Sequence, residues 1–300
     1  MKKIGTLMAA VLFAGVLTVA AAPSALDLTA QTGKGAKAFE LKGKHSRQQL
    51  VATATDAGKQ VDVSRKVTYA ATPAKVVAID ANGMVTPLGN GEATITATHA
   101  GGLKAMVKVA VKEFDVVQPI NFGNEIVPIF TKAGCNGGGC HGKSGGQNGF
   151  RLSLLGFEPQ EDYEYLVKES RGRRLSPAAP ANSLLLLKGA AILPHGGGAR
   201  IDPKSYDWDL MVRWIKQGMP RGQEDDPTIV GLEVYPKQRL VAANAEQQLS
   251  VTAIYSDGHT EDATHIATYE ANDKEIAEVD DTGHVTFFEQ PGDVSVMIRY

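Results

Sequence analysis

The chain has 300 residues, of which 43% are hydrophobic and 21% are charged, and its formal net charge at pH 7 is −2. That length suffices for two or three domains, and the charge balance lacks the basic surplus with which proteins bind nucleic acids. Because only 6% of the residues are aromatic, the cores must be built mainly from Val, Ile, Leu and Ala.

The N-terminus has the pattern of an export signal. Two lysines precede an uncharged apolar run over residues 4–22, within which Val19-Ala20-Ala21 offers a small-residue cleavage pattern. This order is typical of a secretory signal peptide, whereas a retained membrane anchor is the alternative, since the run is nearly long enough to span a bilayer. Its Ala and Gly content and the following Pro23 favour cleavage. We therefore expect residues 1–22 to be a signal peptide, and the mature protein to be periplasmic or at the cell surface without a membrane segment.

An internal repeat divides the chain. A shift of 200 positions superimposes residues of the same type, namely Val51 on Val251, Gly58 on Gly258, Asp62 on Asp262, Tyr69 on Tyr269, Asp80 on Asp280, Gly83 on Gly283, and Val85-Thr86 on Val285-Thr286. Apolar and polar residues alternate over residues 93–98 and 107–111, which is typical of antiparallel strands with one buried face. The repeat therefore predicts two β-sandwiches.

Between the repeats the sequence changes to loops, glycines and helical stretches. Residues 121–132 can form a short helix, and Pro159 with acidic neighbours opens another. The clearest helix is predicted over residues 205–217, where Gly218 and Pro220 then act as stop signals. Such a segment has a thin protein core, which a bound cofactor would complete.

A cysteine motif follows the first of these helices. Cys135 and Cys140 are the only cysteines, and His141 follows the second directly. A cysteine pair closed by Cys-His is typical of c-type haem attachment, in which two thioethers hold the porphyrin and the imidazole ligates iron. The four intervening residues exceed the usual two, but three are glycines, which allow a tight excursion. The motif predicts haem c, with Cys135, Cys140 and His141 as its binding residues.

Two other interpretations of the motif stay open. In an exported chain, two nearby cysteines can simply form a disulfide. A zinc site or free thiols form the second alternative, although zinc knuckles usually belong to reducing compartments.

The second axial ligand of the predicted haem has several candidates. His195 lies between Pro194 and three glycines, and it is the only other histidine of the segment. Met219 and Met211 are thioether candidates, although Met211 also fits the apolar face of its helix. An open or water-bound position is the remaining possibility. We expect His141 and His195 to be the metal ligands.

Other charged residues are interpreted as surface groups. His99, His259, His265 and His284 lie in or beside the strands. The run Arg171-Gly172-Arg173-Arg174 is typical of a solvated surface, with a partner for haem propionates or for an acidic redox protein as the sharper interpretation.

The repeats resemble bacterial immunoglobulin-like domains of group 2. The resemblance depends on residues 77–97, Val-Ala-Ile-Asp-Ala-Asn-Gly-Met-Val-Thr-Pro-Leu-Gly-Asn-Gly-Glu-Ala-Thr-Ile-Thr-Ala, and on the counterpart at 276–298. It implies a role as spacers or adhesive units of bacterial surface proteins.

The middle segment resembles the cytochrome c domain of large surface proteins in planctomycete-type bacteria. Besides the cysteine motif, the resemblance is carried by residues 149–157 with Asp162-Tyr163, by Pro194-His195-Gly196-Gly197-Gly198, and by residues 214–220. It implies covalent haem, export and association with immunoglobulin-like modules.

The expected organisation is a mixed multidomain protein, in which two immunoglobulin-like β-sandwiches flank a small, mostly helical cytochrome c-like domain. The expected boundaries are 1–22 for the signal, 23–113 for the first sandwich, 114–228 for the haem domain and 229–300 for the second sandwich. The second copy ends one strand short of the first, which predicts further chain beyond residue 300.

The expected function is electron transfer or redox sensing at the cell surface, with a redox protein and a surface polymer or polysaccharide as partners. The alternative is a structural or adhesive surface protein with a Cys135–Cys140 disulfide and no redox role. A third possibility is an enzyme whose catalytic domain lies downstream, because no catalytic constellation is evident within residues 1–300.

Overall fold

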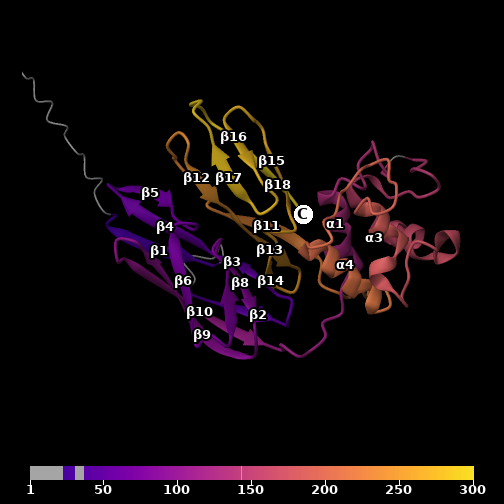
Figure 1. Ribbon diagram of the computed structural model, residues 1–300, viewed down its shortest axis with the longest axis horizontal. Helices are drawn as coiled ribbons and strands as arrows, with labels where there is room; N and C mark the ends of the chain where they lie inside the picture. Colours follow the sequence, from indigo (N-terminus) through magenta and orange to yellow (C-terminus); the bar gives the residue numbers. More distant parts are fainter. Residues whose placement is uncertain (1–22, 31–36, 143) are drawn as a thin grey trace, which may run out of the picture.

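The computed structural model describes residues 23–30, 37–142 and 144–300, which are mostly β-structure with short helices in the middle of the chain (Figure 1). The predicted signal over residues 1–22 lies outside these residues. Among the described residues, no helix has the length and apolar character needed to cross a bilayer.

Repeat 1 is the first sandwich. Its strands are β1 (Ala25–Thr29), β2 (Ala38–Lys42), β3 (Gln48–Gln49), β4 (Val51–Asp56), β5 (Lys59–Asp62), β6 (Val67–Thr72), β7 (Val77–Ile79), β8 (Met84–Pro87), β9 (Gly91–His99) and β10 (Lys104–Lys112). They form sheets in the orders β1-β4-β5, β3-β8-β7 and β2-β10-β9-β6. All pairs are antiparallel except β2 with β10, which is parallel.

The core of repeat 1 follows from the predicted alternation. Along β10, Val107, Val109 and Val111 are buried between exposed or half-buried neighbours, and they pack with Ile95 of β9. Burial of each such side chain stabilises the fold by roughly 1.5–3 kcal/mol. A core of small aliphatic residues therefore suffices here, as the low aromatic content predicts.

Repeat 2 is the second sandwich. Its strands are β11 (Ile229–Tyr235), β12 (Glu246–Gln248), β13 (Ser250–Tyr255), β14 (Thr260–Asp262), β15 (Thr268–Ala271), β16 (Ala277–Val279), β17 (His284–Phe287) and β18 (Val296–Arg299). They pair in the orders β11-β13-β14, β12-β17-β16 and β15-β18. The β15-β18 sheet has two strands among the described residues, where the matching sheet of repeat 1 has four.

One turn shows how closely the repeats correspond. The Asp80 carboxylate accepts hydrogen bonds from the backbone N–H groups of Asn82 and Met84, and Asp280 repeats this pattern in the second copy. Gly83 follows with a φ of 84°, and a Cβ there would meet the Tyr69 hydroxyl at 3.0 Å. Only glycine is relaxed in this left-handed conformation, which explains its return at Gly283. The predicted repeat is confirmed as two copies of one arrangement of β-strands.

The middle segment contains short helices joined by long loops. These are the π-helix η1 (Phe122–Ile126), α1 (Val127–Lys132), the 3-10 turn η2 (Leu154–Gly156), α2 (Pro159–Tyr163), the π-helix η3 (Glu164–Lys168), the 3-10 turns η4 (Glu169–Gly172) and η5 (Pro180–Asn182), α3 (Leu184–Gly189) and α4 (Tyr206–Lys216). The helix predicted over 121–132 forms in two parts, capped by the Asn121 side chain. The helix predicted over 205–217 forms as α4, which the Ser205 hydroxyl caps.

The middle segment has a core made of its own side chains. Trp214 is fully buried and lies 5.4 Å from Phe122, measured between ring centroids, and Phe130 packs beside them. The aliphatic residues around them come from α1, α3, η3 and α4. The expectation of a thin core that needs a cofactor to complete it is therefore wrong, because protein side chains supply the apolar mass.

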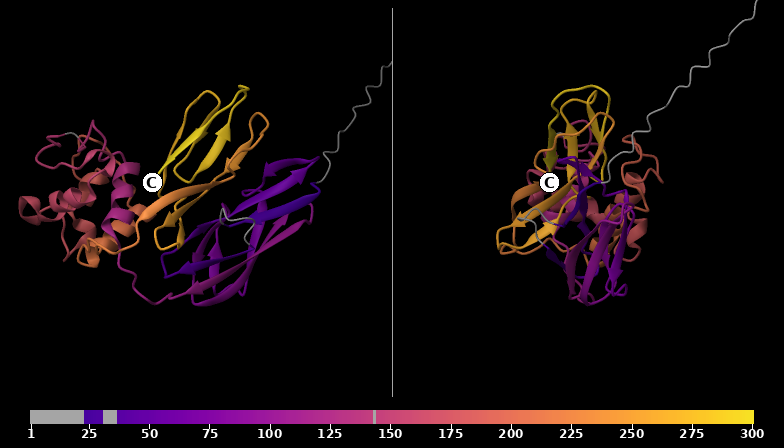
Figure 2. Two further views of the ribbon diagram at one scale, coloured as in Figure 1. Left: turned by 180° about the vertical axis from the view of Figure 1, so that it is seen from behind. Right: turned by 90° about the vertical axis from the view of Figure 1, so that its left-hand side faces the viewer.

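The three parts of the chain touch one another. The helical segment lies at one end, and repeat 2 lies beside it and against repeat 1 (Figures 1 and 2). The Lys132 ammonium donates a hydrogen bond of 2.6 Å to the backbone oxygen of His265, and the Tyr300 hydroxyl donates one of 3.0 Å to that of Asn124. Helical segment and repeat 2 are thus joined by direct hydrogen bonds.

Candidate functional site

The cysteine motif forms a compact loop after α1. The Cys135 N–H donates to the backbone oxygen of Phe130 at 2.8 Å, and the His141 N–H donates to that of Cys135 at 2.9 Å. These bonds fold the chain back so that the two ends of the motif lie side by side. At Gly142 a Cβ would collide with the backbone oxygen of Asn136, so the close return requires glycine.

The two cysteines are free thiols in different surroundings. Cys135 packs against the core of the helical segment, and this burial raises its pKa to about 11. Because the thiolate is the reactive form, the Cys135 thiol is a poor nucleophile at neutral pH. Cys140 is also partly buried.

The structure places the rings of His141 and His195 near each other. Their ring centroids lie 6.2 Å apart and their planes differ by 5°. The Nδ1 atoms lie 2.9 Å from the backbone oxygen of Phe150 and 3.0 Å from that of Gly198, respectively. Because a carbonyl only accepts, each Nδ1 carries a proton, and a ring that is neutral keeps its lone pair on Nε2. Burial lowers the pKa of His141, which favours this neutral form.

Met211 and Met219, the thioether candidates for the second axial ligand, pack in the core of the helical segment. Met211 is fully buried on the inner face of α4. Met219 packs at the edge of the same core, and its backbone oxygen accepts a hydrogen bond of 2.7 Å from Tyr163. Both contribute to the packing of the segment.

The prediction that this segment binds haem c is wrong. Among residues 23–30, 37–142 and 144–300, no group of three or more His, Cys, Asp or Glu side chains could hold a metal ion. Physically, the core that was to receive the ring is filled by Trp214, Phe122 and Phe130, and the Cys135 thiol packs into it. The assignment of iron, and with it the redox partner, is therefore withdrawn. The placement of His141 and His195 as metal ligands stays a prediction.

Two groups interpreted as surface residues are not exposed. Arg174 is 4% exposed, stacks over Phe150 at 4.7 Å, and donates hydrogen bonds to the backbone oxygens of Gly149 and Tyr165. It is a structural residue of the loops. His265 is partly buried, and desolvation lowers its pKa to about 3. Its contacts with Lys132 of the helical segment and with Gln49 of repeat 1 could not be predicted from a local sequence pattern.

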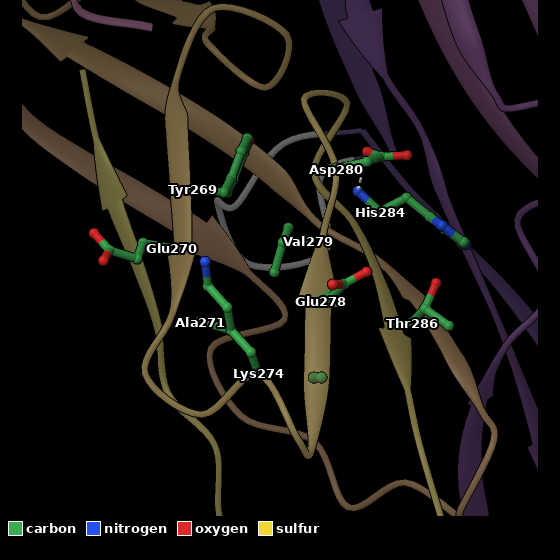
Figure 3. A pocket seen from close by; sticks show the side chains of 10 residues that line it. Tyr269, Glu270, Ala271, Lys274, Glu278, Val279, Asp280, His284 and Thr286 are labelled. Carbon is green, nitrogen blue, oxygen red and sulfur yellow. Dashed lines mark hydrogen bonds between the residues drawn. The ribbon is translucent and has the colours of Figure 1, made fainter. Parts of the chain in front are cut away.

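Repeat 2 carries an open cavity of about 270 Å³ between β15 and the β16–β17 hairpin (Figure 3). Its polar lining consists of Glu270, Lys274, Glu278, Asp280, His284 and Thr286, and Tyr269 lies beside them. At the positions 200 residues earlier, repeat 1 has Ala70, Ala74, Ala78 and Met84 in place of four of them. The two copies thus share a fold and differ in chemistry at this place.

Comparisons with known proteins give weak likenesses only. No family model matches the chain, so the resemblance of the middle segment to cytochrome c domains is not upheld, and no curated protein matches it either. The chain is similar over 28% of its length to 42% of an intimin mutant of EHEC O157:H7, at 17% identity and a TM-score of 0.19. It is similar over 93% of its length to 26% of the S-layer protein rSbsC(31-844), at 13% identity and a TM-score of 0.24.

A further solved structure, the S-layer protein SbsC domains 4 and 5, covers 93% of both chains at 13% identity and a TM-score of 0.22. The chain spans about a quarter of the longer S-layer structure and less than half of the intimin structure. At these identities and scores, the likenesses assign no role to this protein.

Proposed function

We propose that the protein is an exported structural or adhesive component of the cell surface. In this proposal, residues 23–113 and 229–300 are immunoglobulin-like spacers or binding units, and residues 114–228 are a helical unit that packs beside them. The observation that carries the proposal is the duplication of one sandwich, whose two copies are docked on each other and on the helical unit. A docked tandem of sandwiches sets a fixed spacing and transmits force, which suits a surface scaffold.

The cavity of repeat 2 is the proposed contact point for a surface polymer. Its carboxylates, ammonium group and imidazole can exchange hydrogen bonds with the hydroxyl groups of a polysaccharide, and Tyr269 offers an aromatic wall. Repeat 1 has small or apolar residues at the matching positions and would act as a spacer. The two copies would therefore have different tasks.

Surface exposure can be tested on intact cells. An epitope inserted at the exposed turn Gly101-Gly102 of repeat 1 should be labelled by an external antibody and removed by external protease. A cytoplasmic protein should stay protected in the same cells. An epitope that becomes accessible only after lysis of all cell envelopes would contradict the proposal.

Polymer binding can be tested by cosedimentation with insoluble cell-wall polysaccharide. The double variant Lys274→Ala/Glu278→Ala should bind at least tenfold more weakly than the unchanged protein. The matched control is Lys112→Ala/Glu40→Ala, which removes an exposed ion pair of the same composition from repeat 1. Equal binding by both variants, or none by the unchanged protein, would leave only the structural role.

A further inference from the structure

The two repeats contact each other through a duplicated set of residues. In one direction, the Asp262 carboxylate accepts hydrogen bonds from the Gln48 side chain at 3.0 Å and from the Gln49 N–H at 2.8 Å. In the other, Asp62 accepts from the Gln247 side chain at 2.8 Å and from the Gln248 N–H at 3.1 Å. Each repeat therefore presents one carboxylate and one Gln-Gln pair to the other.

The correspondence extends to the next shell of contacts. His265 lies 3.2 Å from the Gln49 side-chain oxygen, and Arg65, its counterpart in repeat 1, lies 3.5 Å from that of Gln248. Strand β14 of repeat 2 lies against β3, and β5 of repeat 1 lies against β12. Exchanging the two repeats maps this surface onto itself, which is the property of an isologous dimer interface. We call it the Gln-Asp face.

The Gln-Asp face is specific because its four glutamines and Asp262 are buried, whereas Asp62 is half-buried. Asp262 is 9% exposed, and Gln48, Gln49, Gln247 and Gln248 are each 3% exposed or less. Separation of the repeats would leave these groups to water or to another partner of the same shape. A buried donor or acceptor that loses its partner is costly, so a face of this kind discriminates strongly in favour of its own counterpart.

Among the described residues, repeat 1 contacts repeat 2 and the helical segment, which together form one body. The helical segment and repeat 2 are held together by Lys132 and Tyr300, and they face repeat 1 side by side. Besides the Gln-Asp face, the Arg47 guanidinium lies 3.5 Å from the ring centroid of Tyr206, whose hydroxyl donates to the backbone oxygen of His45. A second copy of this body would offer repeat 1 the same set of contacts.

The covalent tie between repeat 1 and this body is an irregular linker. Residues 113–119 connect the end of β10 to the buried Ile120, and they run without strand or helix between the two parts (Figure 1). Val116 is 53% exposed and Val117 is 77% exposed. Phe114 packs against the core of repeat 1, and the Gln118 backbone oxygen accepts a hydrogen bond from Gln217. The exposed residues 115–117 between them can change direction at low cost, as hinge loops in exchanged dimers do.

We propose that the Gln-Asp face is an assembly surface whose second occupant is another copy of this chain. In the assembly, repeat 1 of each chain leaves its own body, and through the 113–119 linker it docks on the body of the partner chain. The product is a closed two-fold dimer that keeps every contact of the monomer and changes only the linker. The inference is independent of the proposed surface function.

The first test shortens the linker in the full chain. Deletion of residues 115–117 removes roughly 10 Å of reach, which should prevent repeat 1 from docking on its own body. Light scattering after size-exclusion chromatography should give a monomer for the unchanged chain at low micromolar concentration and a dimer for the shortened chain. Adding Asp62→Ala and Asp262→Ala should abolish the dimer, whereas Glu40→Gln, an exposed change elsewhere on repeat 1, should leave it intact.

Hydrogen exchange of two amides reports on the face directly. The N–H groups of Gln49 and Gln248 should be protected in the unchanged monomer and in the shortened dimer, and open in the Asp62→Ala/Asp262→Ala form. A shortened chain that stays monomeric with both amides protected would overturn the proposal. So would a dimer that survives the two aspartate changes, because it must use another surface.

The second test keeps the natural linker. Arg239 contacts Gln60 across the repeats, so full-length chains carrying Gln60→Cys or Arg239→Cys, each with Cys135→Ser and Cys140→Ser, can be cross-linked only between chains when mixed. Exchange predicts a covalent heterodimer whose yield rises with concentration and with time. Gln60→Cys mixed with Glu289→Cys is the matched control. Equal yields in both mixtures, or no product from folded variants, would contradict the exchange.

Discussion

Glu125 has a carboxyl group whose charged form is disfavoured by burial. It accepts a hydrogen bond of 2.7 Å from the Asn121 N–H, and desolvation, with a smaller contribution from Glu261, raises its pKa to about 7. The folded state therefore binds a proton that the unfolded state has already released. Its contribution to stability is present below the ordinary pKa of about 4.5 and is lost as the pH rises through 7.

We predict that Glu125→Gln stabilises the protein at pH 8 and has little effect at pH 4.5. Glutamine keeps the acceptor for Asn121 and removes the charge, so the expected gain at pH 8 is about 1–3 kcal/mol. Thermal melting at the two pH values measures it. The exposed Glu164→Gln serves as control, and an equal gain at both pH values would show that charge is not the cause.

His265 has the opposite dependence on pH. Desolvation, followed by the nearby positive charges of Arg47 and Lys132, lowers its pKa in the folded protein to about 3. Below pH 6.5 the unfolded chain therefore binds a proton at this residue that the folded protein does not bind. This contribution to stability is lost as the pH falls from 6.5 toward 3. We predict that His265→Gln flattens the acid limb of a stability profile between pH 6 and 4, measured by urea unfolding. An acid limb of unchanged slope in His265→Gln would contradict this assignment.

The cysteine loop gives a prediction about the exported protein. The backbone bond between His141 and Cys135 holds the ends of the loop together, and an oxidising compartment favours disulfides. We predict that chains recovered from the periplasm carry a Cys135–Cys140 disulfide, seen as an intact mass lower by two hydrogens than after reduction. Two free thiols, or a mass above that of the chain, would contradict this prediction and reopen the question of what the loop holds.

At the scale of elements, periodicity and capping were readable and packing partners were not. The duplicated Asp80 and Gly83 turns, the alternation along β10 and the Ser205 cap of α4 all follow from local residue types. The pairing of Asp62 with Gln247 and Gln248 does not, because short polar strands look the same whether they face water or another domain. The motif around Cys135 misled for a related reason, since local spacing does not reveal that a tryptophan fills the adjacent core.

The helix α4 tests whether the middle segment is held by its own core. Trp214 is fully buried, and its indole N–H donates to the backbone oxygen of Pro220 at 2.8 Å. We predict that Trp214→Ala costs about 3–5 kcal/mol of unfolding free energy, as for other large-to-small changes in cores. Denaturant unfolding followed at the second tryptophan, Trp208, measures it. A loss below 1 kcal/mol would mean that the core is not organised around this ring.

For the whole molecule, the duplicated interface makes a symmetric prediction. Asp62 and Asp262 accept equivalent hydrogen bonds from opposite sides of the interface. Asp62→Ala and Asp262→Ala should therefore weaken the free energy of docking between the repeats by a similar amount, about 1–3 kcal/mol each. Each change leaves the other set of hydrogen bonds in place, so a single variant should stay docked, and only the double variant should separate the repeats. Small-angle scattering should then show an increased radius of gyration for the double variant alone.

Because both halves contribute to one interface, the docking free energies in a cycle of single and double variants should be non-additive. If instead one single variant separates the repeats completely and the other has no effect, the face is not reciprocal in energy, and the two copies have diverged in function at the contact that still looks alike.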